Sequence, residues 1–179
     1  MSRKNLISVV AVNVVAAIVL FGLSSFLEPW KEKIFAQHRQ EVFEQLLPGN
    51  PVFSEILYEG EDENISHIYP GENGCVVETV VNGYVDEIRL YVGVDKGGAV
   101  SGVYVADMNE TWGLGRSGMT NFKFLSQFIG TKGTAEVGTD VDALSGATVT
   151  AKAITKAVNS ASAYVTGADV SSGATEWGG

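Results

Sequence analysis

Three β-type segments, separated only by short turns, constrain the fold of this chain more than any other feature of its sequence. The segments 75–81, 87–94 and 99–106 are rich in Val, Ile and Tyr. Asn82-Gly83 begins the first turn, and the glycine-containing segment 95–98 forms the second. Both combinations are typical of hairpin turns. The sequence therefore predicts an antiparallel meander of three consecutive strands.

Two helical patterns follow the predicted meander. The first, 121–129, predicts a short helix closed by Gly130, with four residues directed inward: Phe122, Leu125, Phe128 and Ile129. The second is an apolar stripe at three- and four-residue spacing, made of Ala151, Ile154, Ala157, Val158, Ala161 and Val165. Strands followed by helices predict an α+β domain, and a chain of 179 residues suits one such domain plus an appendage.

The N-terminal part of the chain has a different character. Arg3 and Lys4 precede a segment without charged residues that runs from Leu6 to Leu27. This segment is long enough to cross a bilayer, which needs about 20 residues. A cleaved signal peptide is the alternative, but its apolar core is usually shorter, and no clean cleavage site follows. We expect a membrane anchor over 1–28, with residues 6–27 in the bilayer.

A second helical segment links the predicted anchor to the predicted domain. Apolar residues recur at helical spacing from Glu32 to Leu47, and two prolines and a glycine within 48–51 end the pattern. We interpret 29–50 as a stalk helix. Its apolar residues, which pack on the domain or on a neighbouring subunit, are Ile34, Phe35, Val42, Leu46 and Leu47.

The rest of the chain divides into a domain and a tail. The domain is expected over 51–167, with the acidic segment 59–64 as a solvated loop rather than a calcium site, because calcium loops alternate their oxygen ligands more strictly. Residues 168–179 are expected to form a flexible C-terminal tail.

The start of the C-terminal helix is the main candidate site. It follows the segment 142–150, with the sequence Asp-Ala-Leu-Ser-Gly-Ala-Thr-Val-Thr. A helix N-terminus carries unpaired N–H groups and partial positive charge, so it favours a phosphate. Gly146 and Ala147 leave the backbone approachable, and hydroxyls are offered by Ser145, Thr148 and Thr150. The pattern favours a phosphate-bearing cofactor, while an ordinary helix cap gives the same spacing.

This segment resembles the flavinylation motif of the FMN-binding domain family, Asp-x-x-Ser/Thr-Gly-Ala-Thr. In that family a flavin transferase uses FAD to join FMN, through its phosphate, to the threonine that closes the motif, which is Thr148 here. The resemblance implies covalent FMN at Thr148. The other cofactor-binding residues of the segment are then Asp142, Leu144, Ser145, Gly146, Ala147 and Thr150.

The same seven-residue pattern occurs again from Asp169 to Thr175. No helical pattern follows this second copy, so it has no helix dipole to favour a phosphate, and chain ends tend to be unstructured. We therefore favour Thr148 over Thr175, with Thr150 as a weaker local alternative.

A second stretch also resembles the family. The family's Glu-Thr-Pro-Gly-Leu-Gly loop lies against the flavin, and the residues that correspond to it are Glu110, Thr111, Trp112, Gly113, Leu114 and Gly115. The resemblance implies that the glycine backbone and Thr111 approach the polar edge of the ring and that Leu114 covers a face. Trp112 replaces the usual proline, and its aromatic surface suits stacking on the flavin or a subunit contact.

Other residue classes narrow the range of functions. Cys75 is the single cysteine, so the chain alone forms no intramolecular disulfide and no iron–sulfur cluster. His38 and His67 lie on different predicted elements, and no metal site is predicted. A formal net charge of −9 disfavours nucleic acid as a partner. No Ser-His-Asp pattern indicates hydrolysis.

Within the family the resemblance is closest to the G subunits of Rnf complexes, which are related to the C subunit of the sodium-pumping NADH:quinone oxidoreductase. It implies an electron-transfer subunit with covalent FMN in a membrane-bound, ion-translocating ferredoxin:NAD oxidoreductase. The implied partners are other membrane subunits, a flavin transferase and the bilayer. The implied location is the cell's inner membrane, with a cytoplasmic N-terminus and an extracytoplasmic FMN domain.

Two other functions fit the same residues. One is an anchored flavoprotein that passes electrons to a different extracytoplasmic acceptor. The other is a non-redox binding module, in which the motif is only a helix cap.

Overall fold

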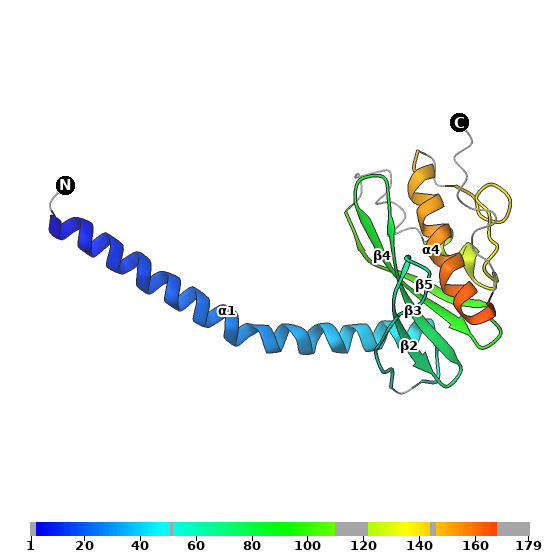
Figure 1. Cartoon of the computed structure of the whole chain (residues 1–179), viewed down its shortest axis with the longest axis horizontal. Coiled ribbons are helices and arrows are strands. Elements are labelled where there is room, and N and C mark those ends of the chain that lie inside the picture. The colour runs from blue at the N-terminus through cyan, green and yellow to red at the C-terminus, as the bar shows by residue number, and fades with distance from the viewer. Residues whose placement is uncertain (1–2, 51, 110–121, 144–145, 168–179) are drawn as a thin grey trace. The chain divides into compact units, whose positions relative to one another are not determined.

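The computed structural model describes residues 3–50, 52–109, 122–143 and 146–167. The chain forms two compact units, Met1–Arg39 and Gln40–Gly179. Helix α1 (Arg3–Leu46) makes up the first unit and supplies the start of the second (Figure 1). Both the predicted anchor and most of the predicted stalk lie in α1. Within the described ranges, no helix has the length and hydropathy needed to span a membrane.

A five-stranded antiparallel sheet forms the centre of the second unit (Figure 1). The strands lie side by side in chain order: β1 (Ile56–Leu57), β2 (Ile65–Gly71), β3 (Gly74–Asn82), β4 (Glu87–Asp95) and β5 (Val100–Met108). The predicted meander is confirmed as β3, β4 and β5, with small differences at the strand ends. The pattern does not predict β1 and β2, because β1 is very short and β2 contains Pro70 and Gly71, which are depleted in strands.

One face of the sheet packs against helix α4 (Thr148–Thr166). Alternate residues of β4 from Ile88 to Val94 point toward this face and are fully buried. The predicted apolar stripe of α4 is confirmed: Ala151, Ile154, Ala157, Val158 and Ala161 are fully buried, and Val165 packs at the margin of the same core. This layer of sheet and helix is the main hydrophobic core.

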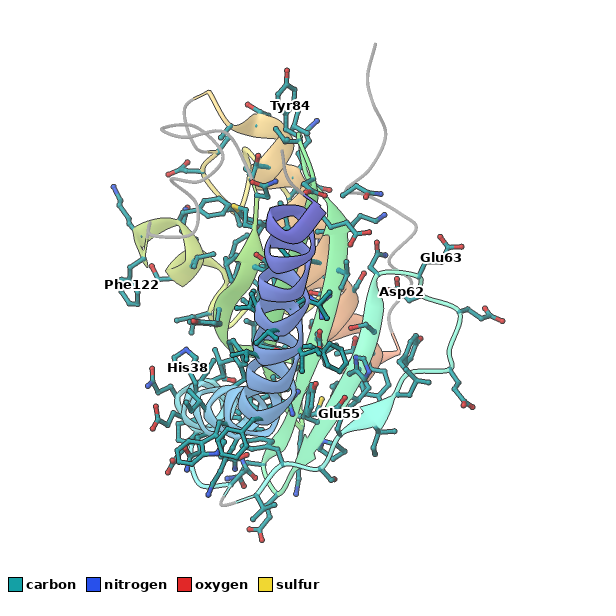
Figure 2. The ribbon with its side chains drawn as sticks, turned by 90° about the vertical axis from the view of Figure 1, so that its left-hand side faces the viewer. His38, Glu55, Asp62, Glu63, Tyr84 and Phe122 are labelled. Atoms are coloured by element: carbon teal, nitrogen blue, oxygen red, sulfur yellow. The ribbon has the colours of Figure 1, made fainter. Side chains whose placement is uncertain are left out.

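Two short helical elements complete this side of the core, α3 (Phe122–Leu125) and the 3₁₀ helix η1 (Ser126–Phe128). Phe128 is buried and Leu125 half-buried, as predicted, but the prediction was wrong for Phe122 and Ile129, which are exposed. Figure 2 shows Phe122 pointing away from the sheet. The change from α to 3₁₀ geometry alters which residues share a face. Phe124 is buried instead and meets Phe128 edge to face at 5.4 Å.

The end of α1 covers part of the opposite face of the sheet. Phe43 is buried there with three residues of the predicted stalk stripe, Val42, Leu46 and Leu47, against Tyr69 and Val76. Packing of the stalk on the domain is therefore confirmed for those three residues. The other two members of the stripe, Ile34 and Phe35, are exposed.

The close approach of α1 depends on a pair of glycines. Gly93 of β4 is paired with Gly102 on the neighbouring strand β5. A Cβ atom at Gly93 would lie 2.5 Å from the carbonyl oxygen of Leu46, and one at Gly102 would lie 2.9 Å from the Leu46 Cδ2 atom. Ser101 donates its hydroxyl hydrogen to the same Leu46 carbonyl. The last turn of α1 thus rests directly on the backbone of the sheet.

A buried carboxylate lies on this same face. Glu78 of β3 is 3% exposed and accepts hydrogen bonds from the Tyr69 hydroxyl at 2.9 Å and from Arg89 Nη1 at 2.8 Å. His67 Nδ1 lies 3.4 Å from Glu78 Oε2. A buried charge is tolerated when it is paired and hydrogen-bonded. The group therefore ties β2, β3 and β4 together through side chains as well as backbone.

The acidic segment forms an exposed loop, as predicted. Glu59, Glu61 and Glu63 are exposed, and Asp62 accepts a hydrogen bond from the backbone N–H of Asn64 at 2.9 Å. Figure 2 shows Glu63 pointing into solvent. The loop leads into β2 at Ile65.

Candidate functional site

Helix α4 begins at Thr148, the residue that closes the motif. The N-cap residue is Ala147, whose methyl side chain cannot accept a hydrogen bond from the amides of the first turn. The N-cap position therefore lacks the side-chain oxygen that an ordinary Ser, Thr or Asp cap provides. An anion at this helix start would find N–H donors and the positive end of the helix dipole.

The two threonines of the first turn differ in exposure. Thr148 is exposed, whereas Thr150 is 1% exposed and points into the core. The two residues face different sides because successive residues of an α-helix are rotated by about 100°. A cofactor and the enzyme that attaches it would reach Thr148 without opening the core, which favours Thr148 over Thr150 as the attachment residue.

The turn before α4 requires glycine. Gly146 has a φ of +75°, in the left-handed region that residues with a side chain rarely adopt. It is exposed, and the next residue, Ala147, is 5% exposed and anchors the start of the helix in the core. The backbone at Gly146 is therefore open to solvent.

The other end of the motif is held by a residue that the sequence pattern does not reveal. The backbone N–H of Asp142 donates to Gln127 Oε1 at 2.8 Å, while the Asp142 side chain is exposed. Val141, just before it, is 1% exposed. The motif is thus bounded by fixed points at Asp142 and at Ala147.

The loop that leads to the motif is pinned to α4. Asn159 is 4% exposed and makes two hydrogen bonds with Ala135. Its Oδ1 accepts from the Ala135 N–H at 3.0 Å, and its Nδ2 donates to the Ala135 carbonyl at 2.9 Å. The loop is therefore held against α4 at Asn159. The one available sequence signal is a polar residue within a helix, which often has a specific partner.

The β3–β4 hairpin lies at the same end of the sheet as the first turn of α4 (Figure 1), and Figure 2 shows its Tyr84 there. Asn109, which follows β5, donates to Asp86 Oδ2 of this hairpin at 3.2 Å. The backbone N–H of Glu87 and the side chain of Asn109 both lower the pKa of the Asp86 carboxyl. The exit of β5 is thus tied to the hairpin.

Several predicted site residues lie outside the described residues. They are the whole of the second stretch, Glu110, Thr111, Trp112, Gly113, Leu114 and Gly115, together with Leu144, Ser145 and the alternative attachment residue Thr175. The described chain reaches Asn109 directly before that stretch. Of the predicted residues that are described, Gly146, Ala147 and Thr148 lie together at the start of α4, Thr150 is buried in its first turn, and Asp142 is held by Gln127.

Part of the chain matches a known protein family. Residues 83–163 match the FMN-binding domain family, a range that begins in the β3–β4 hairpin and ends within α4. This part of the chain is therefore similar to the FMN-binding domain family.

Two curated relatives allow a more specific comparison than the family does. The chain is 34% identical over 122 residues to the G subunit of the Na(+)-translocating ferredoxin:NAD(+) oxidoreductase complex of Acetobacterium woodii, a match that covers 60% of this chain and 58% of that protein. It is 27% identical over 183 residues to the G subunit of the ion-translocating oxidoreductase complex of Methanosarcina acetivorans, covering 90% of this chain and 93% of that protein. The chain is therefore similar to G subunits of ion-translocating oxidoreductase complexes, although it spans less than two thirds of the first relative.

Proposed function

We propose that this chain is the FMN-carrying electron-transfer subunit of a membrane-bound, ion-translocating ferredoxin:NAD oxidoreductase complex of the Rnf type. The observation that carries the proposal is the flavinylation motif, which ends at an exposed threonine on an alanine-capped helix start, within a match to the FMN-binding domain family. Both relatives named above are G subunits of ion-translocating oxidoreductase complexes, and the complex of the first is a ferredoxin:NAD(+) oxidoreductase. The remaining complex subunits would be its partners.

The start of α4 fits a covalently held FMN phosphate. The Thr148 hydroxyl is exposed for attachment, and the first-turn amides of α4 have no side-chain acceptor at the N-cap position. An esterified phosphate carries one negative charge, which the partial positive charge of the helix start offsets without a lysine or arginine. Gly146 lets the chain pass the phosphate without a side chain.

The attachment reaction would use FAD as its co-substrate, and its bonds and atoms are then balanced. The Thr148 hydroxyl forms an Oγ1–phosphorus ester as the pyrophosphate bond of FAD breaks, AMP leaves, and the hydroxyl proton passes to a base or to solvent. The transferase would supply that base, since α4 presents no ionisable side chain in its first turn.

The bound FMN would supply one-electron transfer, and the protein would hold and orient it. Thr148 fixes the phosphate, and the stretch from Glu110 to Gly115 would lie against the ring, as the family resemblance implies. Residues 6–27 would anchor the chain in the inner membrane. The N-terminus would then be cytoplasmic and the FMN domain extracytoplasmic, where a covalent bond prevents loss of the cofactor.

Mass and fluorescence measurements test this proposal. The full-length chain is co-expressed with a flavin transferase, denatured, and examined by intact mass and by in-gel flavin fluorescence. We compare the wild type with Thr148→Val, Thr150→Val and Thr175→Val. The proposal expects an FMN adduct that only Thr148→Val removes.

The other outcomes separate the alternatives. Loss of the adduct only in Thr175→Val would move the site to the C-terminal copy of the motif. A wild type without any adduct, despite an active transferase, would favour a non-redox binding module. An adduct on a chain that co-purifies with no membrane oxidoreductase subunits would favour an electron carrier for another extracytoplasmic acceptor.

A further inference from the structure

The motif has two described residues that are held in place, one before and one directly preceding the attachment residue. At its downstream end, Ala147 is buried and α4 begins. At its upstream end, the backbone N–H of Asp142 is held by Gln127 Oε1 at 2.8 Å. The side chains of Asp142 and Thr148 are both exposed, so neither anchors this segment by burial.

Gln127 is well placed to act as a fixed support. It lies in η1 between Phe124 and Phe128, which are 2% and 0% exposed and are in edge-to-face contact. Its Nε2 also donates to the Phe124 carbonyl at 3.4 Å, which orients the amide. The oxygen that faces Asp142 is therefore carried by an element packed into the core, and its side chain has two partners in place.

We propose that Gln127 is a positioning residue for flavin attachment: it restrains the backbone of Asp142, the first residue of the motif, so that the motif is presented to the flavin transferase in one arrangement. The inference rests on the proposed function, because it assumes that Thr148 is the acceptor. Gln127 acts through the backbone N–H of Asp142.

The expected kinetic effect depends on the fraction of molecules in which the motif is correctly presented. If only part of the molecules present the segment correctly, the apparent affinity falls in proportion to that part, while the step after binding is unchanged. A single hydrogen bond of this kind shifts such an equilibrium by roughly 3- to 10-fold. Loss of the Gln127 acceptor should therefore raise the KM of the transferase for this chain, by up to about 10-fold, with kcat at saturation unchanged.

The test uses the full-length chain with FAD and the transferase, and follows the covalent adduct by in-gel fluorescence over time. Gln127→Met removes the acceptor at similar size and is expected to show the higher KM. Gln127→Glu keeps an acceptor oxygen for the Asp142 N–H and is expected to restore the wild-type KM. Ser126→Ala is the matched control, because it removes a hydrogen bond of the same helical element, to the Lys123 carbonyl, without touching the motif.

Amide hydrogen exchange supplies a second measurement that needs no transferase. In Gln127→Met the amide of Asp142 should exchange roughly 3- to 10-fold faster, while the amide of Ala135, held by Asn159, should not change. Equal KM values for Gln127→Met and Ser126→Ala, or a lower KM in Gln127→Met, would overturn the inference. A wild type that takes up no FMN would instead overturn the proposed function itself.

Discussion

Replacement of Asn159 by alanine should destabilise the second unit by about 2–5 kcal/mol. Asn159 and Ala135 are 4% and 3% exposed, and two hydrogen bonds of 2.9 and 3.0 Å join them. The variant leaves the N–H and the carbonyl of Ala135 without partners in the core. Each such group costs about 1–3 kcal/mol when it is buried and unsatisfied.

A smaller term acts in the opposite direction. Alanine has the higher helix propensity, which offsets roughly 0.5 kcal/mol at a helix position. The net loss should lower the midpoint of thermal unfolding by roughly 5–20 °C for a unit of this size. The exposed Lys152, on the same helix, gives the matched control, and Lys152→Ala should change stability by less than about 0.5 kcal/mol.

Chemical denaturation followed by near-ultraviolet circular dichroism would measure the loss, because this signal reports on buried tyrosines in the second unit. A loss below about 1 kcal/mol for Asn159→Ala would refute the reasoning. It would mean that Ala135 finds other partners and that the loop is not held by α4. An equal loss in Lys152→Ala would point to the helix itself instead of to the pinned loop.

Three further predictions concern the sheet. Gly93→Ala should cost about 1–3 kcal/mol in unfolding experiments, because the new Cβ atom would lie 2.5 Å from the Leu46 carbonyl oxygen; an unchanged stability would show that the end of α1 shifts freely. Arg89→Met should cost about 2 kcal/mol or more, since it leaves the Glu78 carboxylate buried without its cation, and Arg89→Lys should restore part of the loss. Burial raises the pKa of the Cys75 thiol from 9.0 to about 11. Because the thiol of the unfolded chain ionises first, the free energy of unfolding should fall between pH 9 and 11, by at most about 1.4 kcal/mol per pH unit. Cys75→Ala should lack this pH dependence.

The parts of the fold that follow local patterns could be predicted from the sequence. The meander from β3 to β5 follows from residue type and turn residues, and the buried stripe of α4 follows from its spacing. The exposed Phe122 and Ile129 were mispredicted because the short helix becomes 3₁₀ after Leu125. That switch depends on how the chain closes over the core, which the spacing of apolar residues does not encode.

The candidate site also has features that the sequence predicts and features that it does not. The motif places Thr148 at a helix start by local pattern, and residues two apart on a helix already indicate that Thr148 and Thr150 face different directions. The supports of the site, Gln127 and Asn159, contact residues 15 and 24 positions away. Pairings of this range have no periodicity, so the sequence alone does not reveal them.

The extent to which α4 is buried has a consequence for how a cofactor would move. Twelve of its residues are buried, from Thr150 to Ala163, and within this range only Lys152 is exposed, so most of the helix is packed into the core. Its interior amides should exchange with solvent only through unfolding of the whole unit. A flavin attached to Thr148 would therefore move mainly by rotation about the bonds of the threonine side chain and the phosphate, while the helix that carries it stays in place.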